Sequence, residues 1–308
     1  MFISLFIIFL SVMVSAGFFI LFERKMLGYI QLRKGPNKVG FYGIIQPFSD
    51  LVKLIIKEMM FPFMSNYLIY YFCPLMVLII SMIMWMNMPL LSLFMDFEYS
   101  LFFFMCCSSL SVYSIMIAGW SSNNIYCMLS SIRMIAQLIS YEISLFMILF
   151  SYFLMVGGFS LLIFQKFQIY VWMIYLFFPM SLMLIILGLA ETNRSPFDFA
   201  ESESELVSGF NIEYSSSGFI YIFMAEYISI IYLSMLFSMI FLGGNFNQVI
   251  FLFKMIFFIY SWVWVRGCLP RMRYDKLMNL AWKSFLVISI NYLFFYFGLM
   301  VMILSYLS

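Results

Sequence analysis

Acidic side chains gather in one short stretch of this otherwise apolar chain. The segment 191–213 holds six of the 14 acidic residues: Glu191, Asp198, Glu201, Glu203, Glu205 and Glu213. Arg194 is the only cation among them. Carboxylates this close together repel one another, so a coupled set of them shares protons and changes its proton count when a ligand or a charge arrives. The segment therefore predicts a site of coupled protonation.

The order of residues in this segment favours a short helix. Ser195 precedes Pro196, and Asp198 follows three residues after the serine, which is a capping-box arrangement with proline at the first helical position. Gly209 suits the end of such a helix. A helix over about 196–208 would place Glu203 on one side and, on the other, Asp198, Glu201 and Glu205.

Two further acids fall in or beside long apolar runs. Glu226 stands about nine residues inside one run, and Glu142 begins another in "RMIAQLISYEISLF". Carboxylates inside a membrane are costly, so they usually line a polar path or pair with a base. For Glu142, the alternative is an interfacial residue that pairs with Arg133. Both acids are candidates for a proton path.

The chain has few side chains that could bind a metal ion or a redox centre. It has no histidine, and its five cysteines form no CxxC pair. We expect no metal, no redox centre and no cofactor bound by this chain. Proton chemistry would then fall to Asp, Glu, Lys, Tyr and water.

The composition places these side chains in a membrane. The chain is 65% hydrophobic and only 10% charged, whereas soluble proteins carry about 25% charged residues. Lipid leaves unpaired backbone groups without partners, so the runs are expected to be helices. The sequence predicts an all-α polytopic membrane protein, a single integral membrane domain over 1–308, with eight spans: Phe2–Phe22, Leu68–Met88, Ser100–Trp120, Ile143–Phe164, Tyr170–Ala190, Gly218–Leu242, Val249–Val265 and Ser284–Tyr306.

Basic residues orient these spans. The segments after the odd-numbered spans hold 14 of the 16 Lys and Arg residues. The positive-inside rule then predicts inside loops at about 23–67, 121–141, 191–217 and 266–283, with both termini outside. An acidic segment that only improved solubility is unexpected on this side, where loops should be basic. The alternative of a solvated acidic loop is therefore disfavoured.

The first inside loop contains a predicted amphipathic helix, "QPFSDLVKLIIKEMM". Pro47 suits a first helical turn, and Asp50, Lys53 and Lys57 share one face. The other face is apolar, which is typical of a helix that lies in the membrane interface. It would serve as a surface anchor or as one wall of an opening for a lipid-like ligand.

Two long motifs resemble a known family. "ERKMLGYIQLRKGPNKVGFYGIIQPFSDLVKLIIKE" and "ETNRSPFDFAESESELVSGFNIEYSSSGFIYIFMAEY" are similar to chain 1 of proton-pumping NADH:ubiquinone oxidoreductase, respiratory complex I. "QLISYEISL" and "WVRGCLPRMRYDKLMNLAWK" extend the resemblance over essentially the whole chain. It implies a core subunit at the junction of the membrane and peripheral arms, in the mitochondrial inner membrane, with its termini on the intermembrane-space side.

The resemblance also implies substrate, partners and residue roles. Ubiquinone would be the substrate, with FMN and iron–sulfur clusters in partner subunits. The partners would be the quinone-site subunits of the peripheral arm, adjacent membrane-arm subunits and lipids, with no nucleic acid. The quinone tunnel would include Arg24, Asp50, Phe223 and Arg273, with Arg194 between it and the acidic path. That path would comprise Glu142, Glu191, Asp198, Glu201, Glu203, Glu213 and Glu226.

Three other readings stay open. A free-standing ion or proton transporter also has buried acids, but it predicts inverted repeats or broken helices, and the sequence displays neither. A passive scaffold for a soluble partner would explain the large inside loops but not Glu226. A related membrane subunit of a quinone-independent hydrogenase complex differs by the absence of bound quinone.

Overall fold

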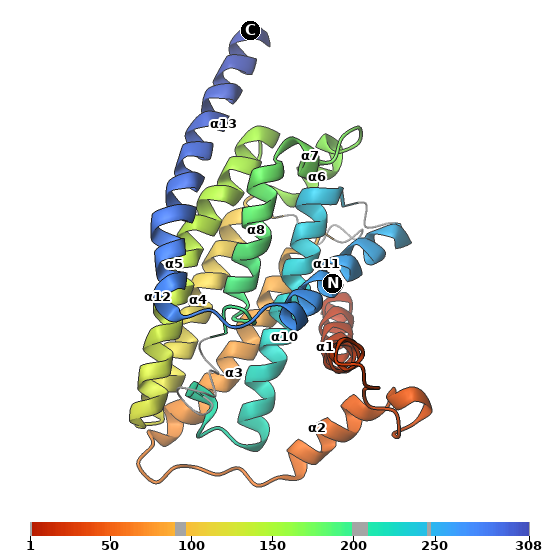
Figure 1. Ribbon diagram of the computed structural model, residues 1–308, viewed down its shortest axis with the longest axis vertical. Helices are drawn as coiled ribbons and strands as arrows, with labels where there is room; N and C mark the ends of the chain where they lie inside the picture. Colours follow the sequence, from red (N-terminus) through yellow and green to blue (C-terminus); the bar gives the residue numbers. More distant parts are fainter. Residues whose placement is uncertain (1, 90–96, 199–208, 245–247, 308) are drawn as a thin grey trace.

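The computed structural model describes residues 2–89, 97–198, 209–244 and 248–307, and within these ranges the chain is helical without any strand (Figure 1). Among the described residues, seven helices are long and apolar enough to cross a membrane. An eighth apolar helix, α8 (Phe178–Glu191), is shorter and follows the single turn α7 (Met173–Leu176). The prediction of an all-α polytopic membrane protein is confirmed.

The long helices match the predicted spans in number and order, with α8 as the short eighth. The first half of the chain forms α1 (Phe2–Ile30), α3 (Tyr67–Met84), α4 (Ser100–Ser121) and α5 (Ile125–Val156). The second half forms α10 (Ser216–Leu242), α11 (Val249–Cys268) and α13 (Leu286–Leu307), the last continuous with α12 (Tyr274–Asn279) and a π-helical turn (Leu280–Phe285). Short pieces complete the fold: 3₁₀ turns at Phe41–Gly43, Trp85–Asn87 and Gly209–Asn211, and α6 (Leu161–Phe167).

The start of α5 differs most from the prediction. α5 begins at Ile125, after Asn124, whose side chain accepts a hydrogen bond from the Tyr126 amide at 3.1 Å. Most of the segment predicted as an inside loop, 121–141, is therefore helix. The polar residues that interrupt its apolar pattern find partners inside the protein: the Gln137 amide donates to the carbonyl oxygens of Ala190 and Phe197.

α10 is the central helix of the structure. It is apolar around its whole circumference, and a helix of that kind is buried. Of its most apolar stretch, 67% is buried inside the protein. It packs against α1, α2, α3 and α11. Phe223, Glu226 and Tyr227 are thereby placed on a helix with neighbours on all sides.

The predicted interfacial helix is present as α2 (Gln46–Ile56), with Pro47 in its first turn. Figure 1 shows α2 at the periphery of the structure, beside the end of α10 and close to α1. Its buried side faces α1 and α10, and its exposed side carries Phe48, Val52, Ile55 and Ile56. The exposed apolar side is the part available to lipid.

Candidate functional site

A channel lies between α1, α2 and α10. It consists of two adjoining cavities of about 360 and 300 Å³. The walls that both cavities share are Gly17, Pro47, Leu51, Ile220 and Met224. Three segments far apart in the sequence thus enclose these two cavities, which together have the size of small-molecule sites.

The two ends of this channel differ in polarity. One end is lined by apolar side chains: Met13, Val14, Phe18, Phe48, Ile55 and Leu78. The other end, near the C-terminal part of α1, adds Glu23, Arg24, Asp50, Tyr227 and Arg266. Phe219 and Phe223 of α10 line this polar end as well. The channel therefore suits a long molecule with an apolar tail and a polar head.

An ion pair closes the polar end between α1 and α2. Arg24 Nη1 lies 2.6 Å from Asp50 Oδ2, and Gln46 Nε2 donates to Asp50 Oδ1 at 2.9 Å. The Arg24 and Asp50 side chains are partly exposed, so the pair adds little to stability. The position of the pair is informative, because both charged side chains line the polar end of the channel and face a molecule bound there.

A second, buried ion pair joins three helices at the same end. Glu23 of α1 pairs with Arg266 of α11, and the Tyr227 hydroxyl of α10 donates to Glu23 Oε2 at 2.6 Å. The side chain of Glu23 is 8% exposed. Sequence reasoning missed Glu23 as a site residue. The available signal was an acid directly at the end of the first apolar run, ahead of Arg24 and Lys25.

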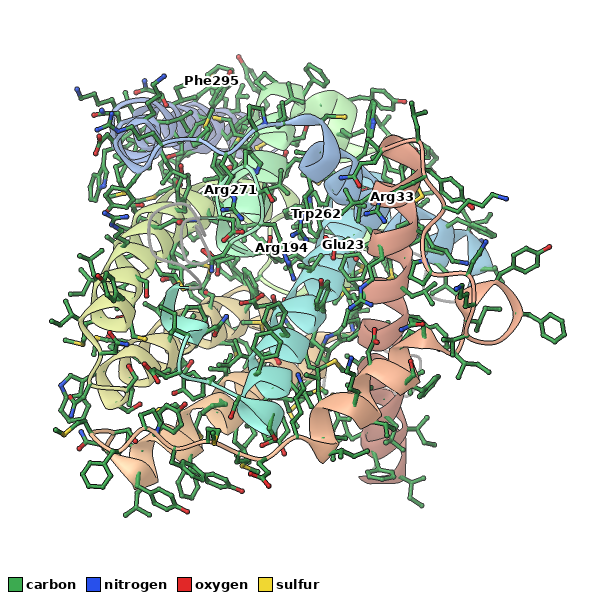
Figure 2. The ribbon with its side chains drawn as sticks, turned by 60° about the horizontal axis from the view of Figure 1, so that its bottom comes forward. Glu23, Arg33, Arg194, Trp262, Arg271 and Phe295 are labelled. Carbon is green, nitrogen blue, oxygen red and sulfur yellow. The ribbon has the colours of Figure 1, made fainter. Side chains whose placement is uncertain are left out.

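Arg194 connects this pair to the acid of α10. Its guanidinium lies over the Tyr227 ring, with Cζ 4.4 Å from the ring centroid, and its Nη2 is 3.6 Å from Glu226 Oε2. Figure 2 shows Arg194 and Glu23 close together beside α10, with Arg271 farther off. The contacts form a continuous polar chain: Arg266, Glu23, Tyr227, Arg194 and Glu226.

Glu226 also lines an internal cavity of about 70 Å³, here called the acidic cavity. Glu191 lines the same cavity, together with the polar residues Ser81, Ser111, Thr192, Asn193 and Ser229. Glu191 Oε2 and Asn193 Oδ1 are buried, and within the described residues neither has a hydrogen-bond partner. A water molecule needs a cavity of roughly 10–15 Å³, so several waters fit here and can donate hydrogen bonds to these oxygens.

Glu142 lies in the middle of α5, not at the mouth of a span. Ser108 of α4 donates to Glu142 Oε1 at 3.0 Å. Ser111, one turn further along α4, lines the acidic cavity. Because Ser108 and Ser111 are neighbours on α4, Glu142 lies near the acidic cavity, although it does not line this cavity.

Two acids of the predicted path, Asp198 and Glu213, lie on either side of the segment 199–208 in the sequence. Buried Asp198 pairs with Arg271 at 3.2 Å. Glu213 Oε1 accepts from Asn124 Nδ2 at 2.7 Å, and its backbone oxygen accepts from the Tyr70 hydroxyl. Tyr214 stacks on Tyr70 with centroids 4.3 Å apart, and burial raises the pKa of its phenol. Neither acid lines the channel or the acidic cavity.

The structure thus divides the predicted site residues. Arg24, Asp50 and Phe223 line the channel, whereas Arg273 is exposed and pairs with Asp275 at 3.0 Å.

The predicted helix does not begin at Pro196, because 195–197 form a turn in which the Phe197 amide donates to the Arg194 oxygen at 2.8 Å. Glu201, Glu203 and Glu205 lie outside the described residues.

Comparison with known proteins gives the family. A family model described as NADH dehydrogenase matches residues 3–297. This chain belongs to that family. It is 58% identical to NADH-ubiquinone oxidoreductase chain 1 of Locusta migratoria over 96% of this chain and 94% of the relative. The same-named chain of Aedes aegypti is 55% identical over 97% and 95%, and that of Hylobates lar 42% over 98% of each. The resemblance drawn from the sequence motifs is confirmed.

Proposed function

We propose that this chain is a core membrane subunit of proton-pumping NADH:ubiquinone oxidoreductase. It forms part of the ubiquinone tunnel and of the acidic path that couples quinone reduction to proton movement. Family membership supports the assignment to this enzyme. The channel between α1, α2 and α10 supports the assignment of a ubiquinone tunnel. An isoprenoid tail matches the apolar end of the channel, and a quinone head matches the polar end.

The polar chain from Arg266 to Glu226 carries this proposal. Quinone reduction takes up two electrons and two protons, so negative charge and a demand for protons develop where the head binds. The FMN and iron–sulfur clusters that deliver the electrons belong to partner subunits. In this chain, Tyr227 and Glu23 meet that demand first, because both line the polar end of the channel.

Arg194 then transmits the change to the acidic cavity. Its guanidinium contacts the Tyr227 ring on one side and the Glu226 carboxylate on the other. A change of charge at Glu23 or Tyr227 alters the attraction on Arg194, and this alters the stability of the charged form of Glu226. Glu226 and Glu191 line the same cavity, so waters in that cavity would connect the two carboxylates.

The competing functions fit this arrangement less well. An ion or proton transporter explains the acidic cavity but gives no use for an apolar channel half lined by Val14, Phe18 and Phe48. A quinone-independent hydrogenase subunit likewise needs no space for a tail. We place the chain in the mitochondrial inner membrane, with both termini on the intermembrane-space side and the acidic segment facing the peripheral arm.

Isolation in mild detergent tests the assignment. An antibody against this chain should capture a large assembly that oxidises NADH with ubiquinone and with an artificial acceptor at the flavin. Capture of the chain alone, or of an assembly that reduces the artificial acceptor but never ubiquinone, would refute it.

A further inference from the structure

A third cavity lies where α3 ends and where α4 and α6 begin. It is here called the outer cavity, because the basic inside loops lie at the other end of these helices. Its volume is about 440 Å³. Its walls combine apolar side chains with five polar residues: Asn87, Glu98, Ser100, Ser160 and Lys166. It shares no wall residue with the channel or the acidic cavity, and the proposed function gives it no role.

Asn87 brings a hydrogen-bond acceptor to the outer cavity. The residue is 4% exposed, and its Nδ2 donates to the Ser100 backbone oxygen at 3.0 Å and to Tyr232 Oη at 3.1 Å. A backbone oxygen can only accept, so this contact fixes which end of the amide is the nitrogen. The other end, Oδ1, is buried and has no hydrogen-bond partner within the described residues. Because a buried acceptor without a donor is costly, a donor bound in the cavity would stabilise this side chain.

Glu98 and Lys166 bring charges of both signs to the same cavity. Both side chains are exposed, and in the described part of the chain neither forms an ion pair. A ligand with a single charge would be attracted by one of them and repelled by the other. A ligand with a cation and an anion a few bonds apart would be attracted by both. The Ser160 hydroxyl, which also lines the cavity, adds a donor for an anionic group.

The surroundings of the cavity favour a lipid over a soluble ligand. Tyrosine and tryptophan are enriched at the level of lipid headgroups. Tyr99, Tyr170 and Trp172 are exposed in the segments beside the cavity, next to the ends of α4 and α6. Farther along α4, the exposed side chains include Phe102 and Leu110. A headgroup in the outer cavity would thus leave its acyl chains beside an apolar helix face.

We propose that the outer cavity binds the headgroup of a diacyl phospholipid with a primary ammonium group, phosphatidylethanolamine. This inference goes beyond the proposed function and does not depend on it. The lipid ammonium donates to Asn87 Oδ1 and to the Glu98 carboxylate, while Lys166 and Ser160 bind the phosphate. The trimethylammonium group of phosphatidylcholine carries no N–H and cannot donate to Asn87. A purely anionic headgroup is repelled by Glu98.

Photolabelling with a headgroup series tests the site in the assembly that is captured through this chain. The probes share the same photoreactive acyl chain, and their headgroup nitrogen carries fewer N–H groups from ethanolamine through N-methyl and N,N-dimethyl to choline. The ethanolamine lipid should label peptides from 97–110 or 159–166. The choline lipid should need about tenfold more probe, a difference of about 1.4 kcal/mol. Equal labelling across the series, or labelling confined to other segments, overturns the proposal.

Variants assign the individual contacts. Glu98→Gln and Lys166→Gln each remove one exposed charge, so each should weaken labelling by the ethanolamine lipid about threefold. Asn87→Leu should make the ethanolamine and choline lipids label equally, because the acceptor that distinguishes them is gone. Glu58→Gln and Lys276→Gln change exposed charges that do not line the cavity and should label as wild type does. If Asn87→Leu does not assemble, the headgroup series on the wild-type assembly decides the preference.

Competition separates a lipid from a free headgroup. Excess unlabelled phosphatidylethanolamine should suppress the labelling, whereas water-soluble glycerophosphoethanolamine at the same concentration should not. Equal suppression by the soluble compound would show that the cavity takes a soluble ligand and would overturn the lipid site. Labelling at the wild-type level in both Glu98→Gln and Lys166→Gln would also contradict it, because neither charge would then contribute to binding.

Discussion

Replacing Gly17 by phenylalanine is expected to lower quinone-linked NADH oxidation by about tenfold or more, a barrier change of about 1.4 kcal/mol. Gly17 lines both halves of the channel, and a Cβ at this position would lie 3.8 Å from the Pro47 side chain. A phenyl ring would therefore project into the channel where its two cavities adjoin. The measurement is NADH oxidation with a long-tailed ubiquinone by the assembled complex.

Gly298 supplies the matched control. A Cβ at Gly298 meets nothing within 4 Å, so Gly298→Phe should leave the activity unchanged. Electron transfer from NADH to an artificial acceptor at the flavin should survive in both variants. Full activity in an assembled Gly17→Phe complex would show that quinone does not use this channel.

The second large effect is expected at Arg194. Arg194→Gln removes the guanidinium that lies between Tyr227 and Glu226. Removing one partner of a buried pair typically costs about 3–5 kcal/mol, because the other charge stays buried. We expect quinone-linked turnover and proton pumping to fall together by about tenfold or more, whereas reduction of the artificial acceptor should persist.

A double variant separates stability from function. Arg194→Gln with Glu226→Gln removes both charges, so the complex should regain the assembly level of wild type. Pumping should stay low, because Glu226 itself is gone from the acidic cavity. Wild-type pumping in Arg194→Gln, or its full recovery in the double variant, would exclude Glu226 from the coupling path.

Most of the fold could be predicted because the membrane permits few alternatives. Apolar runs of about 20 residues become helices, and α2 followed directly from its two-faced pattern. The prediction was wrong at the start of α5, where Gln137, Ser140 and Glu142 interrupt the apolar run. A prediction that looks only for uninterrupted apolar runs assigns such residues to a loop. Inside a protein, however, polar side chains can form hydrogen bonds with neighbouring helices, as Gln137 does.

The candidate site was predictable only in part. Arg24, Asp50 and Phe223 line the channel, and their assignment to a quinone tunnel stays a prediction. Glu23 was missed because its partner Arg266 is 243 residues away, and no local pattern reveals such a pair. Arg273 shares a basic segment with Arg271, yet only the latter pairs with an acid of the predicted path, Asp198.

Photolabelling of the intact complex tests the central claim, that ubiquinone occupies the channel between α1, α2 and α10. A photoreactive ubiquinone analogue, with the reactive group on its tail, should label peptides from 46–57 and 217–227, and excess ubiquinone should suppress the labelling. Labelling of this chain confined to segments outside 46–57 and 217–227, or labelling confined to other subunits, would contradict the claim.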